Sequence, residues 1–225
     1  MSGAALERLT EAAKSWGEPL GASTLDAISS YLAFVREKNT EVNLTSDHGW
    51  DDLVLKHAAD GVFAASVLRP LLPPSPRILD LGSGAGFIGI VLKLVWPEAQ
   101  VTLMESVERK YRFLNAAATN TGLKGLRVLN RRAGSGAALT AYELNHDVVI
   151  ERALAELPEA LRLSWPMLGP KGLFAAFQSD EPDATEPALA KSLAAACATV
   201  LKSFHYRRPN ESRDRRLMLF KRKED

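Results

Sequence analysis

The residues with the clearest chemical meaning lie in RILDLGSGAGFIGIVL, residues 77–92, where four glycines follow a short apolar run. Read from Gly84, GAGFIG fits the G-x-G-x-x-G turn that brings backbone N–H groups close to the pyrophosphate of a dinucleotide. Read from Asp80, DLGSGAG fits D-x-G-x-G-x-G, the pattern of enzymes that bind S-adenosylmethionine (SAM). The two readings predict different ligands for the same turn.

Asp80 favours the SAM reading. An acid at the tip of the strand opposes a bound pyrophosphate, whereas SAM has no phosphate and carries an ammonium group that a carboxylate can hold directly or through water. Glu105, about 20 residues beyond the turn, fits both readings because it can bind ribose hydroxyls. We therefore predict a SAM site, and the alternative is a tight turn that binds nothing. The predicted contacts along these two strand ends are Asp80, Gly82, Ser83, Gly84, Gly86, Glu105 and Ser106.

The composition excludes several other classes of protein. The chain has 225 residues, of which 46% are apolar and 24% charged, which is ordinary for a globular protein. No stretch stays apolar long enough to span a bilayer and the N-terminus has no secretory pattern, so we expect a cytoplasmic protein. The single cysteine, Cys197, excludes an internal disulfide and a cysteine-based zinc site, and we expect a buried structural thiol and no bound metal.

A basic segment lies near the C-terminus, although the formal net charge of the chain is only +1. Its basic residues are Lys202, Arg207, Arg208, Arg213, Arg215, Arg216, Lys221, Arg222 and Lys223, and its acids are Glu211 and Asp214. This surplus indicates either an anionic partner or a solvated edge strand and tail, and the charge alone does not choose between them.

The first part of the chain is predicted to be helical. Apolar spacing predicts helices in LERLTEAAKSW and LDAISSYLAFV, the second with Ser23 or Thr24 as its N-cap. KNTEVNLTSDHG is a predicted break, and a helical period returns in DDLVLKHAADGVFAASVLRPLL before the proline connector LLPPSP. We divide the chain into a helical extension, residues 1–72, packed on a SAM-binding domain, residues 73–225.

Strands and helices alternate from Arg77 onward, which predicts a parallel sheet covered on both faces. The predicted strands are RILDLG, QVTLMES, LRVLN, DVVIER, GLFAAFQ after a GPKG turn, LKSFHYR and RLMLFKR. An alanine-rich helix is expected near residues 186–198, but only a polar turn separates the last two strands, which predicts an antiparallel pair. The result is an α/β, doubly wound, mostly parallel sheet that resembles the Rossmann-like fold of class I SAM-dependent methyltransferases.

Motifs along the chain resemble one family. In order they are KNTEVNLTS, LVLKHAADG, the glycine motif, LMESVERKYRFL, VLNRRA, DVVIERALAEL and RDRRLMLFKR. From Tyr31 to Lys221 they follow the pattern of the bacterial glucose-inhibited division protein B family. The resemblance implies SAM as cofactor and methyl transfer to N7 of a guanine in 16S ribosomal RNA, free or in the small subunit, by an enzyme that we expect to be a monomer.

The resemblance also implies roles for particular residues. Asn43, His57 and Arg152 are placed at the reaction site, Arg132 and Ala133 at the SAM pocket, and Arg132, Arg152 and Arg215 on RNA. From the basic segment we add Arg207, Arg208 and Arg216 as expected RNA contacts. The alternatives are a satisfied histidine on a helix face and ordinary surface arginines. The cations Arg109, Lys110 and Arg112 are interpreted as a solvated helix face.

Methylation of guanine N7 needs little acid–base chemistry, because this ring nitrogen attacks with a free lone pair and loses no proton. The chain lacks the D/N-P-P-Y/F motif of amino-group enzymes, and Cys197 is badly placed for cytosine-C5 chemistry. Two alternatives stay open: a diverged methyltransferase acting on another RNA or a small molecule, and a SAM-binding module without turnover.

Four positions depart from the family pattern. Ile88 and Val91 stand where prolines are common, Glu151 replaces the serine of S-R-A, and Gln178 replaces the lysine of A-L-K-G. An added acid and a lost cation both lower the positive potential around the expected substrate entrance.

Overall fold

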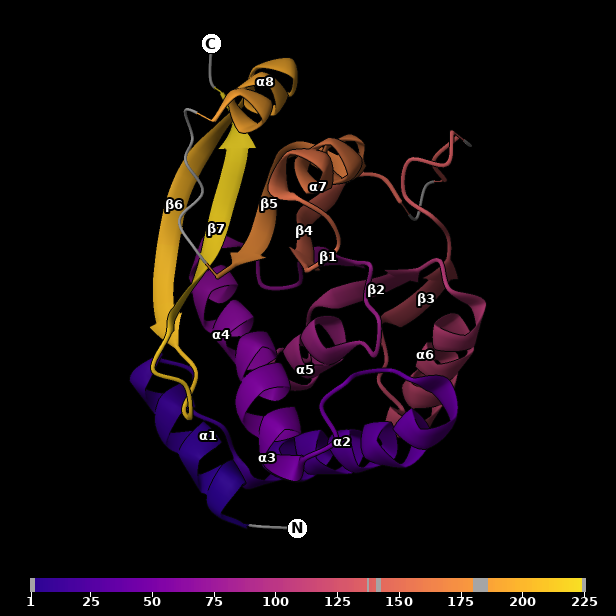
Figure 1. Ribbon diagram of the computed structural model, residues 1–225, viewed down its shortest axis with the longest axis vertical. Coiled ribbons are helices and arrows are strands. Elements are labelled where there is room, and N and C mark those ends of the chain that lie inside the picture. Colours follow the sequence, from indigo (N-terminus) through magenta and orange to yellow (C-terminus); the bar gives the residue numbers. More distant parts are fainter. Residues whose placement is uncertain (1–2, 137, 141–142, 180–185, 224–225) are drawn as a thin grey trace.

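A seven-stranded sheet organises the computed structural model, which describes residues 3–136, 138–140, 143–179 and 186–223 (Figure 1). The strands are β1 (Arg77–Leu81), β2 (Gln100–Glu105), β3 (Leu126–Asn130), β4 (His146–Arg152), β5 (Leu168–Gln178), β6 (Ala198–Arg207) and β7 (Asp214–Arg222). The helices are α1 (Gly3–Ser15), α2 (Ala22–Val42), α3 (Trp50–Asp52), the π-helix η1 (Leu53–Ala58), α4 (Ala59–Leu68), η2 (Arg69–Leu71), α5 (Phe87–Val95), α6 (Glu108–Thr121), α7 (Leu157–Ser164), η3 (Trp165–Met167) and α8 (Pro187–Ala195).

The strand order, β3-β2-β1-β4-β5-β7-β6, confirms the predicted fold class. Strands β1 to β5 pair in parallel, whereas β7 is antiparallel to both β5 and β6. From β1 the chain builds the sheet outward through β2 and β3 on one side. It then crosses back to β4 on the other side of β1, so the order of the strands reverses at β1. Ligands of open α/β sheets bind at this switch point, beyond the carboxyl ends of the strands.

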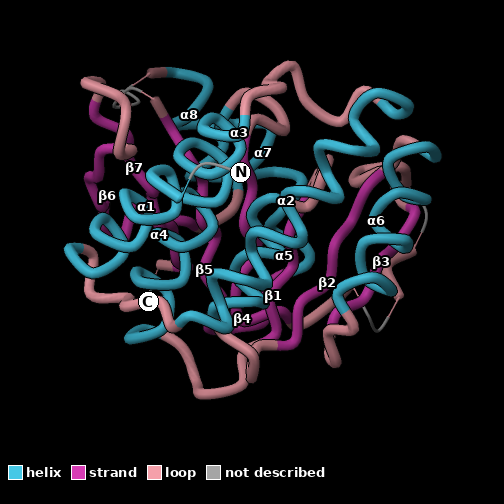
Figure 2. Tube along the Cα trace, turned by 90° about the horizontal axis from the view of Figure 1, so that it is seen from below, coloured by secondary structure: helices cyan, strands magenta, loops and turns pink. Residues whose placement is uncertain are grey.

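Two apolar layers sandwich the sheet, because successive side chains along a strand point to opposite faces. Ile78 packs into a core shared with α1, α2, α4, α5 and α6, and Leu79 packs into a second core under α7 and α8. In Figure 2 the helices of the first layer cross in front of the strands. On β7 the same alternation sends Leu217 to the first core and Met218 to the second.

The N-terminal helices belong to this first layer. The Tyr31 hydroxyl on α2 donates to the Ala85 carbonyl oxygen (2.7 Å), and Trp16, Phe63 and Tyr206 form mutual ring contacts between α1, α4 and β6. One apolar core therefore crosses the proposed boundary between residues 72 and 73, and that division stays a prediction. Among the described residues, none of the helices has both the length and the apolar character to cross a membrane.

The ends of α2 differ from the prediction. The helix begins at Ala22 after Gly21, and no side chain caps it, so the N-cap assignments to Ser23 and Thr24 are wrong. It continues to Val42, into the segment predicted as a break. It ends where Asn43 adopts a left-handed conformation (φ 53°), which asparagine tolerates better than most residues.

Three further local predictions need correction. The helix expected through Lys56 and His57 is a π-helix there, a feature that often occurs at functional sites. The GPKG turn is part of β5, where the pairing register shifts between His146 and Val148. Cys197 is exposed, because it adopts a left-handed conformation (φ 47°) just after α8 and faces away from the core.

Candidate functional site

The glycine turn lies between β1 and α5, at the switch point of the sheet. Gly82, Gly84 and Gly86 have φ values of 72°, 60° and 83°, a backbone region that residues other than glycine rarely adopt. The N–H groups of Gly82 and Ser83 donate to the Met104 carbonyl oxygen on β2 (2.9 and 3.0 Å). The turn is thereby pinned in a conformation that leaves its backbone uncovered by its own side chains.

Asp80 connects this turn to the start of α5. Its Oδ2 accepts a hydrogen bond from the Gly89 N–H (2.9 Å), and the residue is buried while lining a cavity of about 430 Å³. Burial raises the pKa of Asp80 to about 6, although the Gly89 N–H and the charge of Arg152 act in the opposite direction. A ligand ammonium in this cavity would stabilise the ionised carboxylate.

We predict that Gly89→Ala weakens both the fold and SAM binding. An added Cβ would lie 2.3 Å from Leu103 Cδ2 and 2.9 Å from Asp80 Oδ2, so Asp80 must move. We expect a loss of about 2 kcal/mol of unfolding free energy, measured by urea denaturation, and weaker SAM binding by calorimetry. Gly84→Ala is the matched control for stability, because its Cβ meets open space and only its positive φ is strained. Equal stability losses in the two variants would refute the steric account.

Glu105 has a more specific local role than the sequence predicts. Its Oε2 accepts from the Gly84 N–H (2.9 Å) and its Oε1 from the Val107 N–H (2.7 Å). The carboxylate therefore ties the end of β2 to the glycine turn. Binding of ribose hydroxyls by Glu105 stays a prediction.

A second cavity, of about 440 Å³, lies on the other side of Gly82. It contains all the remaining predicted SAM contacts on the β2 and β3 ends: Ser106, Arg132 and Ala133, together with the apolar side chains of Leu81 and Met104. Gly82 lines both cavities, and Leu154 stands over it, 2.6 Å from where a Cβ would lie. The buried carboxylate in the first cavity fits the ammonium end of SAM. The second cavity is mostly polar, and the side chains of Leu81, Met104 and Leu154 supply the apolar surface that an adenine ring could contact.

His57 and Arg152 meet in the first cavity, as the sequence predicts. Arg152 donates to Asp60 Oδ2 (2.7 Å) and to His57 Nδ1 (2.9 Å), and His57 Nε2 lies 2.9 Å from Asp47 Oδ2. The imidazole also stacks on Phe87, with ring centroids 4.0 Å apart. The π-helix η1 and the end of β4 thus converge on one contact.

His57 is neutral at physiological pH. Burial and the charge of Arg152 lower its pKa to about 4, against the opposing effect of Asp47. The contacts are satisfied when Nδ1 accepts from Arg152 and Nε2–H donates to Asp47. His57 therefore orients Arg152 and has no proton to supply near pH 7.

Asn43 lies beside the first cavity, and the following residues Leu44 and Thr45 line it. Asn39 was not among the predicted site residues, and its Oδ1 accepts from the N–H groups of Leu44 (2.7 Å) and Thr45 (2.9 Å). Asn39 is buried and holds this turn in place. Asn39 lies in the KNTEVNLTS motif itself, four residues before Asn43, and that placement is the signal that could have indicated it.

The predicted RNA-binding arginines do not share one surface. Arg152, Arg208 and Arg215 line the first cavity and Arg132 the second. Arg208 is buried, with its guanidinium held by Asp60 and Glu211. RNA contact by Arg208 stays a prediction. Arg207 pairs with the exposed Asp214, and strand alternation turns Arg216 to the face opposite Arg215.

Lys110 also requires a correction. It lines the first cavity, although its helix face was interpreted as solvated. The first turn of α6 follows the end of β2 directly, which brings Lys110 to the cavity while Arg109 stays exposed.

The family departures have distinct surroundings. Ile88 and Val91 are buried in a regular α5, and Gln178 pairs across the ladder with Arg216. Glu151 is completely buried. Its Oε2 accepts from the Leu154 N–H (3.1 Å), and its Oε1 has no hydrogen-bond partner among the described residues.

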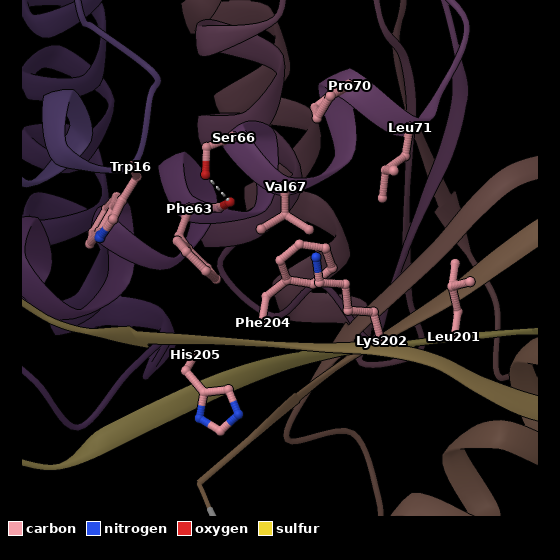
Figure 3. Close-up of a pocket in the computed structure, with 10 residues that line it drawn as sticks. All are labelled: Trp16, Phe63, Ser66, Val67, Pro70, Leu71, Leu201, Lys202, Phe204 and His205. Atoms are coloured by element: carbon pink, nitrogen blue, oxygen red, sulfur yellow. Dashed lines mark hydrogen bonds between the residues drawn. The ribbon is translucent and has the colours of Figure 1, made fainter.

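An apolar groove of about 570 Å³ lies elsewhere, between α4 and the edge strand β6. Figure 3 shows Trp16 and Phe63 at one end and Leu71 and Leu201 at the other. It contains none of the predicted site residues. Within the part of the chain that the structure describes, no three His, Cys, Asp or Glu side chains form a cluster that could hold a metal ion.

The sheet order, the glycine turn and its buried acid define a class I SAM-dependent methyltransferase. Solved structures share the fold: a Burkholderia thailandensis 1,6-didemethyltoxoflavin-N1-methyltransferase matches with a TM-score of 0.56 and 22% identity, covering 92% of each chain. A ribosomal protein L11 methylase from Lactobacillus delbrueckii also has a TM-score of 0.56, with 14% identity, covering 80% of this chain and 81% of its own.

The particular family follows from the sequence. The GidB family model, described as rRNA small subunit methyltransferase G, matches residues 24–214, and this chain belongs to that family. A ribosomal RNA small subunit methyltransferase G from Hydrogenovibrio crunogenus is 33% identical over 73% of this chain and 72% of the relative. The one from Acetivibrio thermocellus is 29% identical over 79% and 72%. The sequence-based family assignment is confirmed.

Proposed function

We propose that this chain transfers the methyl group of SAM to N7 of a guanine in 16S ribosomal RNA. The observation that carries the proposal is the charge arrangement of the first cavity, where Asp80 is the buried acid and Lys110, Arg152, Arg208 and Arg215 are cations. A carboxylate suits the ammonium of SAM, and guanidinium groups suit phosphate and unpaired bases. The names of the relatives support ribosomal RNA as the substrate.

The residues at the site position the reactants and transfer no proton. Guanine N7 is already nucleophilic, and bound SAM supplies an electrophilic methyl group. His57, neutral and hydrogen-bonded on both nitrogens, keeps Arg152 directed into the cavity, where Arg152 orients the base. Rate enhancement then comes from in-line alignment and from electrostatic control of a ring that becomes cationic. The guanine must be unpaired or extruded to enter.

The RNA contacts that we propose follow from position. Lys110 and Arg215 at the first cavity and Arg132 at the second contact phosphate near the target nucleotide. Arg207 and Arg216 make outer contacts on the C-terminal strand pair. We further propose that the protein acts as a cytoplasmic monomer.

Arg215→Ala is expected to abolish RNA methylation while leaving SAM affinity nearly intact. Arg215 lines the first cavity from β7, and its hydrogen bond goes to Glu211 and not to a predicted SAM contact. Loss of one phosphate contact should also reduce the slope of log Kd against log salt by about 1. Arg112→Ala, an exposed arginine paired with Glu108, is the control and should change neither quantity. Unchanged turnover in Arg215→Ala would remove this residue from the site.

The function is tested by methyl transfer from radiolabelled SAM to small ribosomal subunits and to extracted rRNA from a strain lacking the gene. Mass spectrometry of the labelled nucleosides should identify 7-methylguanosine. Label in another nucleoside, or in a small molecule, would establish a diverged substrate, for which Glu151 and Gln178 would be the first positions to examine. SAM binding without any labelled product would favour a binding module.

A further inference from the structure

Five side chains of alternating charge connect the interior of the first cavity to its rim. Arg152 donates to Asp60 Oδ2 (2.7 Å), and Arg208 donates to both oxygens of the same carboxylate (2.8 and 2.6 Å). Arg208 also donates to Glu211 Oε1 (2.9 Å), whose Oε2 accepts from Arg215 Nε (2.7 Å). All three arginines line the cavity, whereas neither acid does.

Asp60 is the buried centre of this chain. It is inaccessible to solvent, and it also accepts from the Tyr206 hydroxyl (2.6 Å). Burial alone would favour a neutral carboxyl, but the hydrogen bonds from Arg208 and the charge of Arg152 hold the pKa of Asp60 below its usual value. A permanently ionised acid on α4 therefore fixes two arginines, one from β4 and one from the connection between β6 and β7.

Glu211 performs the same task at the rim. It lies in the connection after β6 and uses one oxygen for each of its two arginines. Arg215 lines the first cavity, and its Nε is the atom that Glu211 holds. The N-terminal helix pins this connection as well, because Arg8 on α1 donates to the Pro209 carbonyl oxygen (2.6 Å).

We propose that Asp60 and Glu211 are positioning residues that hold Arg152, Arg208 and Arg215 as one preformed array for the phosphate and base of the target nucleotide. Free arginines lose side-chain conformational entropy when they are immobilised. Two acids that fix three arginines before binding remove much of that loss. This inference rests on the proposed RNA methyltransferase function and adds residues that contact neither SAM nor RNA.

Asp60→Asn tests the inner half of the array. We expect the single-turnover rate of RNA methylation, at saturating SAM and RNA, to fall at least 30-fold, while the Kd for SAM changes less than 3-fold. Tyr206→Phe is the matched control, because it removes a hydrogen bond to the same carboxylate and leaves both arginine contacts. Its rate should stay within 3-fold of wild type. Equal losses in the two variants, or a rate in Asp60→Asn within 3-fold of wild type, would overturn the proposal.

Glu211→Gln tests the rim, and this variant keeps the buried Asp60 cluster intact. Removing a negative charge beside bound RNA should tighten binding if Glu211 merely neutralises its neighbours. If Glu211 positions Arg215, RNA binding should instead weaken, by at least 5-fold, despite the lost acid. Filter binding at two salt concentrations measures whether the Kd for RNA rises or falls in the variant. Tighter binding by Glu211→Gln would refute a positioning role.

The two proposals fail in different ways. If wild-type protein labels no RNA, the proposed function falls. If wild type forms 7-methylguanosine but Asp60→Asn matches its rate or Glu211→Gln binds RNA more tightly, only the array falls.

Discussion

Replacing Arg152 by alanine is expected to lower kcat/KM for RNA methylation by about 10²–10³-fold and to reduce the unfolding free energy by about 3 kcal/mol. The guanidinium is shared between Asp60, His57 and the cavity, so truncation removes the group that orients the base. It also leaves the fully buried Asp60 with Arg208 as its only cationic partner among the described residues. The buried negative charge is then less well compensated, which lowers the unfolding free energy.

Arg152→Lys separates the two effects. A lysine keeps the positive charge near Asp60 but cannot also bond to His57 in the planar geometry of a guanidinium. We therefore expect most of the stability to return, measured by urea denaturation, while the methylation rate stays low. Full recovery of activity in Arg152→Lys would show that charge alone, without orientation, suffices at this position.

Replacing Glu151 by glutamine should make the protein less sensitive to alkaline pH. Burial raises the pKa of Glu151 to about 7, with a further increase from Asp80 across the sheet and an opposing effect from Arg152. The folded protein thus keeps this proton up to about pH 7, whereas the unfolded chain releases it near pH 4.5. Because the unfolded state binds fewer protons in that interval, wild-type stability falls as the pH rises.

The variant has no proton to lose at this position, so its advantage over wild type should grow by about 2.5 kcal/mol between pH 5 and pH 8. The amide that replaces the unpartnered Oε1 costs some stability at every pH. The diagnostic quantity is therefore how much the difference in unfolding free energy between variant and wild type changes from pH 5 to pH 8. Urea midpoints of both proteins at the two pH values provide it. Parallel pH profiles would show that Glu151 is ionised in the folded protein without penalty.

The sequence by itself determined the fold class and which residues come together at the glycine turn. Alternating short apolar runs and helices require a covered parallel sheet, and the final pair without a helix requires antiparallel strands. In such a sheet the first strand-to-helix turn lies at the switch point, so Asp80, Gly82 and Glu105 had to meet there. Local sequence patterns suffice to predict these features, because each strand, helix and turn depends mainly on residues that are neighbours in the chain.

Other features were beyond local pattern. The ends of α2, the π-helical turn around His57 and the exposure of Cys197 depend on packing and on backbone angles that composition does not specify. Lys110 reaches the cavity only because α6 starts directly at the end of β2.

Only the tertiary structure decided which charges line the first cavity and which acids they pair with. The sequence placed Arg208 and Arg215 in one basic segment. Both line the first cavity, but Arg208 is buried against Asp60, whereas Arg215 is only partly buried and is paired with Glu211. Asp60 lies 92 residues from Arg152 and 148 from Arg208. No periodicity links positions so far apart, because a buried ion pair is selected by three-dimensional proximity and by the free-energy cost of leaving either charge alone.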